Sequence, residues 1–201
     1  MIKAIIFDFG NVICNFHNYK FINKISKYTD KSTNEINEII FNKSGLQSKY
    51  ERGEITSDEF YIEVVNKCKL NISKNKFIES YTNIFTPIKP NFELVKKLKK
   101  KYKLGLLSNT SEWDYLYGIK TIEIFNLFDT ITLSFEVKTS KPNKLIYEDA
   151  LKKLNLKPSE CVYIDDIKEF SDKATQIGMH GINYTPNTNL VEELKKISVD
   201  I

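Results

Sequence analysis

The sequence is poor in the residues that interrupt or cross-link a fold. Its 201 residues include seven glycines, five prolines and three cysteines, which excludes collagen-like, low-complexity and disulfide-rich proteins. Cys14, Cys68 and Cys161 are widely separated, lie in apolar surroundings and form no zinc-binding spacing. We therefore expect free thiols in a reducing compartment and a globular protein with a sizeable apolar interior.

The sequence also lacks a large charge excess and a long apolar run. Its formal net charge is only +4, which does not predict a nucleic-acid or membrane partner. The lysine-rich stretch Lys96–Lys103 carries Leu98 and Tyr102 at helical spacing, so its lysines are expected on the solvent face and C-terminal end of a helix. The N-terminal apolar run stops at Asp8, too early for a signal peptide or membrane span, and we expect a cytoplasmic protein.

Strand and helix patterns alternate in the second half of the chain. Apolar residues recur at helical spacing over 91–102 and 145–154, and Pro142 suits the first turn of the second helix. Short apolar, β-branched or aromatic runs predict buried strands at 3–7, 104–107, 130–135, 162–164 and 181–184. The alternation predicts an α/β fold with a doubly wound parallel sheet, covered on both faces, whose strand order stays open.

The segment from residue 15 to 87 has helical patterns and no clear strand. Ser32 with Glu35, and Thr56 with Glu59, have the spacing of capping boxes that begin helices. We interpret 15–87 as a helical cap inserted after the first strand, and 1–14 with 88–201 as the α/β core.

Polar residues gather where the predicted strands end. Asp8, Gly10 and Asn11 follow the first strand, Ser108 and Asn109 the second, Lys141 comes after the third, and Asp165 and Asp166 follow the fourth. Ligands bind at the carboxyl ends of such strands. A carboxylate nucleophile, hydroxyl and amide donors, a cation and acids for Mg²⁺ are what phosphoryl transfer needs. Taken singly, each group also fits a turn or a helix cap.

Four motifs in order resemble the haloacid dehalogenase-like (HAD) superfamily. They are IIFDFGNVI, LLSNTSE, SKPNKLIYEDAL, and VYIDDIKEF with the following KATQIGMHGI. The stretch YERGEITSDEF, at residues 50–60, is similar to the cap of the α-D-glucose-1-phosphate phosphatase branch. The resemblance covers nearly the whole chain and implies a HAD core with a Rossmann-like sheet and a helical cap.

The resemblance also implies roles at the matching positions. Asp8 would be the nucleophile that forms an aspartyl-phosphate, and Mg²⁺ would be held by Asp8, the Gly10 carbonyl and Asp166, with Asp165 as an additional or indirect ligand. Ser108 would bind a phosphate oxygen, and Asn109 would orient the nucleophile or substrate. Lys141 would neutralise the charge on Asp8 and the phosphate.

Two positions depart from the family pattern. Gly10 stands where most HAD phosphatases carry a general acid, although the glucose-1-phosphatase branch also has glycine there. Phe170 replaces an asparagine that usually follows the acidic pair. Asn11 is expected to order the first loop and help bind substrate, and His17 or Asn15 is a candidate substrate contact or proton donor at the entrance to the cap.

The resemblance predicts a phosphatase that acts on a small phosphorylated metabolite such as a sugar phosphate. Two alternatives stay open. A 2-haloacid dehalogenase would need no metal, and the acidic pair argues against it. A HAD-like module that only binds its ligand is favoured by Gly10 and Phe170. The physiological substrate and the oligomeric state are not predicted.

Overall fold

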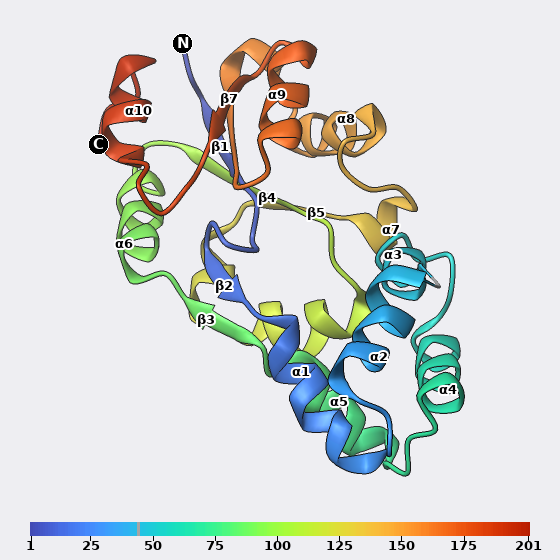
Figure 1. The fold of residues 1–201 in the computed structure, drawn as a ribbon. Coiled ribbons are helices and arrows are strands. Elements are labelled where there is room, and N and C mark those ends of the chain that lie inside the picture. Colours follow the sequence, from blue (N-terminus) through green and yellow to red (C-terminus); the bar gives the residue numbers. More distant parts are fainter. Residues whose placement is uncertain (44) are drawn as a thin grey trace.

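A computed structural model describes residues 1–43 and 45–201 of the chain. Its centre is a parallel sheet of five strands in the order β5-β4-β1-β6-β7. Figure 1 shows this sheet with helices packed around it. These strands are β1 (Ala4–Phe7), β4 (Lys103–Ser108), β5 (Thr130–Leu133), β6 (Cys161–Asp165) and β7 (His180–Asn183). The predicted α/β fold is confirmed, and the order places β1 at the middle of the sheet.

Helices cover both faces of the sheet. Ile5 and Phe7 of β1 pack with α6 (Lys89–Leu98) and α10 (Leu190–Lys196), whereas Ala4 and Ile6 pack on the other face. That second face is covered by α8 (Lys144–Leu154) and α9 (Lys168–Ile177). Successive side chains of a strand point to opposite faces, so a strand covered on both sides is apolar throughout, as β1 is.

Residues 18–82 form a separate helical layer (Figure 1). They contribute most of the residues of an apolar core distinct from those of the sheet. The elements of this layer are α1 (Asn18–Ile25), η1 (Ser26–Tyr28), α2 (Thr33–Asn37), η2 (Glu38–Lys43), α3 (Leu46–Glu51), α4 (Ser57–Cys68) and α5 (Lys74–Thr82). Both predicted capping boxes are present, at the start of α2 and of α4. The prediction missed two short strands, β2 (Cys14–Phe16) and β3 (Phe85–Pro87), which pair antiparallel where the chain leaves and re-enters the core.

Several predicted boundaries were wrong. The third strand ends at Leu133, because the chain turns into the short helix α7 (Ser134–Val137). The helix predicted over 91–102 ends at Leu98; the chain then turns so that Lys103 can begin β4 beside Ala4. Pro142 was expected in the first turn of the next helix, but it lies before α8. That helix begins at Lys144, after Asn143, whose side chain caps it.

The remaining short helical turns are η3 (Asp114–Gly118), η4 (Ile119–Thr121), η5 (Glu123–Leu127) and η6 (Pro158–Glu160). Among the described residues, no helix has the length and apolar character needed to cross a membrane.

Candidate active site

Three carboxylates meet at the carboxyl ends of β1 and β6. These strands pair in parallel with Phe7 beside Ile164, so Asp8 and Asp165 leave the sheet side by side. One oxygen each of Asp8, Asp165 and Asp166 lie within 4.8 Å of one another. Strand register therefore builds the acidic cluster from residues that are far apart in the chain.

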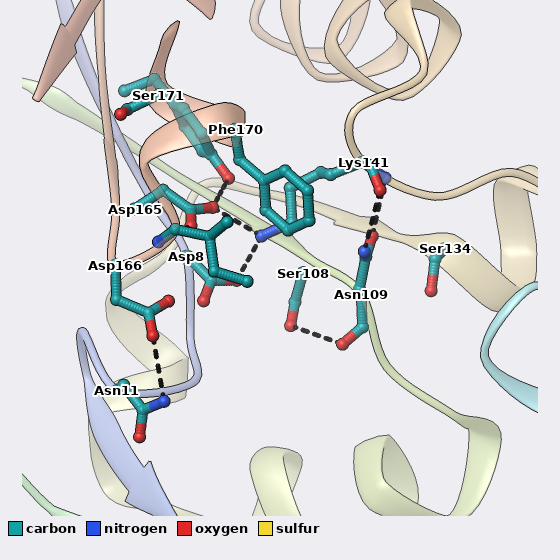
Figure 2. Close-up of polar contacts among 12 residues, drawn as sticks. Asp8, Asn11, Ser108, Asn109, Ser134, Lys141, Asp165, Asp166, Phe170 and Ser171 are labelled. Carbon is teal, nitrogen blue, oxygen red and sulfur yellow. Dashed lines mark hydrogen bonds and ion pairs between the residues drawn. The ribbon is translucent and has the colours of Figure 1, made fainter. Parts of the chain in front are cut away.

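Lys141 lies inside this cluster. Its Nζ is 2.7 Å from Asp8 Oδ1 and 2.7 Å from Asp165 Oδ2, and its side chain is only 2% exposed. Figure 2 shows the lysine between the two carboxylates with the Phe170 ring beside it; the centre of that ring is 5.1 Å from Nζ. The structure thus brings the predicted nucleophile, acids and cation together.

Burial and charge shift the pKa values of these groups. Burial raises the pKa of Asp8 to about 7, although Lys141 opposes the shift. Burial also raises the pKa of Asp166, against the effect of the hydrogen bond from Asn11. Burial lowers the pKa of Lys141, but Asp8 and Asp165 outweigh it and the value lies above its usual range. The lysine is therefore charged, and Asp8 titrates near neutral pH before any cation binds.

Both carboxylate oxygens of Asp165 accept hydrogen bonds within the protein. One oxygen accepts from Lys141 Nζ and the Tyr163 hydroxyl, and the other accepts from the Ile167 backbone N–H at 2.8 Å. Asp166 instead accepts a bond from Asn11 Nδ2 at 3.0 Å and lines the cavity described below. Asp166 is thus the acid of the pair with more capacity to coordinate a cation.

The Asn109 side chain holds Lys141 in place. Asn109 Oδ1 accepts from the Lys141 backbone N–H at 2.9 Å, and Nδ2 donates to the Lys141 carbonyl at 3.3 Å. Both ends of the amide contact the Lys141 backbone, so Asn109 positions the lysine loop. Asn109 also lines the cavity described below, and its expected contact with nucleophile or substrate stays a prediction. The Ser108 hydroxyl has only a long contact of 3.5 Å to the Asn109 carbonyl, which leaves it able to donate to a ligand.

Gly10 is enclosed by an aromatic ring. A Cβ atom at this position would lie 2.9 Å from Phe16 Cε1 and 3.0 Å from Phe16 Cδ1, closer than carbon atoms tolerate. Phe16 comes from β2 and lines the same cavity as Gly10. The place of the usual general acid is therefore filled by a side chain of the inserted segment.

A cavity of about 250 Å³ opens over the acidic cluster. Core residues Asp8, Ser108, Lys141 and Asp166 line it together with residues of the inserted segment. Pockets for drug-sized ligands measure about 300–1,000 Å³, so this cavity suits a smaller molecule. Phe170 also lines it, beside the lysine.

His17 is not among the described residues that line this cavity, and the same is true of Asn15. Residue 17 has an extended backbone, so its side chain points away from the side that Phe16 takes. Its ring lies 5.2 Å from that of Tyr19. Neither candidate therefore lines the cavity that holds Asp8 and Lys141.

The cavity is also lined by polar residues that the sequence did not single out, among them Gln47, Glu51 and Asp114. Glu51 lies in the YERGEITSDEF stretch, which was the available signal for it. Asp114 follows the second motif by a few residues in the turn η3, and no pattern singled it out. Gln47 and Glu51 come from α3 and Asp114 from η3, so two separate elements contribute these polar side chains to the cavity.

The chain matches known proteins along most of its length. A family model for haloacid dehalogenase-like hydrolases matches residues 2–168. The D-ribitol-5-phosphate phosphatase of Bacteroides thetaiotaomicron is 24% identical over 175 residues, which cover 83% of this chain and 84% of that protein.

Two solved structures share the fold. A HAD family enzyme from Bacteroides thetaiotaomicron, in complex with magnesium and inorganic phosphate, has a TM-score of 0.82 at 22% identity and covers 96% of this chain and 98% of its own. The L-2-haloacid dehalogenase of Xanthobacter autotrophicus has a TM-score of 0.68 at 15% identity, and the match covers 100% of this chain and 85% of the dehalogenase. At these identities the likeness extends to the fold alone.

Proposed function

Because the chain belongs to the haloacid dehalogenase-like hydrolase family, we propose that it is a Mg²⁺-dependent phosphatase acting on a small sugar or polyol phosphate. The observation that carries the proposal is the bridge that Lys141 makes between Asp8 and Asp165, next to Asp166, in a cavity of limited size. The named phosphatase among the relatives supports the substrate class. The narrower resemblance to glucose-1-phosphate phosphatases stays a prediction.

In the proposed reaction an Asp8 carboxylate oxygen attacks phosphorus, and the bond from phosphorus to the leaving oxygen breaks. Water then attacks the phosphorus of the aspartyl-phosphate, which releases inorganic phosphate and restores Asp8. Lys141 holds a positive charge 2.7 Å from the nucleophile, which offsets the repulsion between two anions. The Ser108 hydroxyl donates to a phosphate oxygen.

The three carboxylates have the oxygen-only chemistry that Mg²⁺ prefers. Asp8, Asp166 and the Gly10 carbonyl would hold the ion, which would supply further neutralisation of the phosphoryl charge. Asp165 acts through Lys141, since its oxygens are already bonded within the protein.

Residues 15–87 act as the cap in this proposal, and 1–14 with 88–201 as the catalytic core. The support is that side chains from both parts line one cavity and that the β2–β3 pair joins them. Closure of such a cap excludes water from the site.

The test is hydrolysis of p-nitrophenyl phosphate with and without Mg²⁺. We expect Mg²⁺-dependent turnover that falls to background in Asp8→Asn and persists in Lys144→Met, which changes an exposed lysine. If Asp8→Asn keeps its turnover, as Lys144→Met does, Asp8 is removed from the mechanism. Halide release from a 2-haloacid without metal would favour a dehalogenase, and a folded, Mg²⁺-loaded protein inactive on all phosphate esters tried would favour a binding module.

A further inference from the structure

Two carboxyl groups of the cavity have no part in the proposed phosphoryl transfer. Glu51 ends α3 in the inserted segment, and Asp114 begins η3 in the core. Both line the cavity that holds Asp8 and Lys141. Any leaving group attached to a phosphate at Lys141 must therefore fit beside them.

A chain of hydrogen bonds connects the two groups. Gln47 Nε2 donates to Glu51 Oε1 at 2.8 Å, and the Tyr81 hydroxyl donates to Gln47 Oε1 at 3.0 Å. The Tyr81 and Ser111 hydroxyl oxygens are 3.1 Å apart, and Ser111 Oγ lies 2.9 Å from Asp114 Oδ2. Four links thus tie an acid of the inserted segment to an acid of the core.

The number of protons available along this chain of hydrogen bonds favours a neutral Asp114. With Asp114 ionised, Ser111 and Tyr81 each use their single proton elsewhere, and no proton remains between their two oxygens. If Asp114 carries a proton, it donates to Ser111, Ser111 donates to Tyr81, and every link has one proton. Burial raises the pKa of Asp114 to about 7, which agrees with this arrangement. Burial raises the pKa of Glu51 as well, while the hydrogen bond from Gln47 and the positive charges of Lys141 and Arg52 favour its ionised form.

Asp114 also has an acceptor that the protein does not use. The residue is only 6% exposed, and its Oδ1 has no hydrogen-bond partner among the described residues. Leaving a buried acceptor without a donor is unfavourable, so a ligand that brings a donor gains affinity. This unpartnered oxygen is independent of the Glu51 charge and points to the same kind of ligand.

Glu51 is fixed relative to the phosphate end of the cavity. Its backbone carbonyl accepts from the Ser134 hydroxyl, whose oxygen accepts from the Thr110 backbone N–H at 2.9 Å. Thr110 follows Ser108 and Asn109, so one short path joins the Glu51 backbone to the residues that face the phosphate. The Glu51 side chain cannot move far from a leaving group without breaking its hydrogen bond to Gln47.

We propose that Glu51 and Asp114 determine substrate specificity by accepting hydrogen bonds from a hydroxyl or ammonium group of the leaving group and by repelling leaving groups that carry a carboxylate or a second phosphate. The inference deepens the proposed phosphatase function and rests on it. Charge repulsion in a partly buried cavity is strong enough to act as a filter. The preferred substrates are small polyol or amino-alcohol phosphates.

Glycerol 3-phosphate and 3-phosphoglycerate test this filter, because they share a three-carbon skeleton and differ by a terminal hydroxyl against a carboxylate. We expect kcat/KM to favour glycerol 3-phosphate at least tenfold. Glu51→Gln should lower that ratio at least fivefold, mainly by improving 3-phosphoglycerate. The matched control is Glu54→Gln, which changes an exposed glutamate three residues away that is paired with Arg52; it should leave the ratio unchanged.

Failure of the filter and failure of the function give different results. Turnover of both esters with equal efficiency, or a ratio that Glu51→Gln does not change, overturns the specificity role and leaves the phosphatase intact. Absence of turnover on p-nitrophenyl phosphate overturns both. If only p-nitrophenyl phosphate is hydrolysed, the inhibition constants of the two esters against it decide by the same ratio. If Glu51→Gln does not fold, the wild-type ratio decides, and a value below threefold overturns the inference.

Discussion

Replacing Lys141 by methionine tests the charge arrangement of the site. Methionine keeps most of the side-chain volume, so the effect comes from charge and not from a cavity. The change leaves Asp8 and Asp165, which are 7% and 0% exposed, without their shared cation. Removing one partner of a buried ion pair costs about 3–5 kcal/mol of unfolding free energy. For a protein of this size that corresponds to a fall in Tm of about 6–20 °C.

The size of the loss depends on pH in a defined direction. In the wild type the folded-state pKa of Asp8 is about 7, above its unfolded value, so the folded protein keeps a proton that the unfolded chain has lost. Stability from this group therefore falls as pH rises toward 7. Without Lys141 the folded-state pKa of Asp8 rises further, so the fall in stability continues to higher pH. We expect Lys141→Met to be more destabilising at pH 8 than at pH 6.

The assay is thermal and urea unfolding in EDTA at pH 6, 7 and 8, repeated with Mg²⁺. Lys144→Met is the control, because that lysine is exposed and pairs with Glu148 on the same helix, which predicts a change below about 0.5 kcal/mol. With three carboxylates and no lysine, the variant should gain more Tm from Mg²⁺ than the wild type, while losing phosphatase activity. Unfolding at pH 8 that matches the Lys144→Met control would refute the reasoning.

Other perturbations follow from single contacts. Gly10→Asp should lower Tm without raising turnover of glycerol 3-phosphate, because Phe16 fills the space, whereas combining it with Phe16→Ala should raise turnover by about a hundredfold; equal rates in both would contradict this. Asn11→Gly keeps the positive φ of 52° but removes the bond to Asp166, so calorimetry should find Mg²⁺ affinity about tenfold weaker. For Asp114 the folded-state pKa is raised to about 7, so this group should lower wild-type stability by up to about 4 kcal/mol between pH 4 and 7; urea unfolding should show a smaller fall over that range in Asp114→Asn than in the wild type.

The α/β class and the positions of most strands followed from local patterns. A strand such as β1, buried on both faces, is apolar at every residue, and Asp8 marks its end. Helix starts were equally local, because a capping box needs only residues three positions apart. The end of β5 was misplaced for a tertiary reason. Ser134 lies beyond the strand and forms hydrogen bonds with the backbones of Thr110 and Glu51. No pattern within residues 130–135 predicts these contacts.

The candidate site was predicted in part. Asp8, Ser108, Lys141 and Asp166 were expected to meet because they follow strand ends, and they line one cavity. The structure adds a role for Asn109 that the sequence did not predict, because its amide holds the Lys141 loop. Such a role depends on which polar atom lies opposite, and residue type alone does not reveal that.

The sequence by itself determined which chemical groups stand at the edge of the sheet, because alternation of apolar strands and amphipathic helices brings strand ends to one side. Tertiary structure decided how those groups are paired. The register of β1 with β6 places Asp8 beside Asp165, and the packing of the inserted segment puts Phe16 over Gly10 and Glu51 into the cavity. These contacts join residues far apart in the chain, so they depend on strand order and helix packing, which local periodicity does not encode.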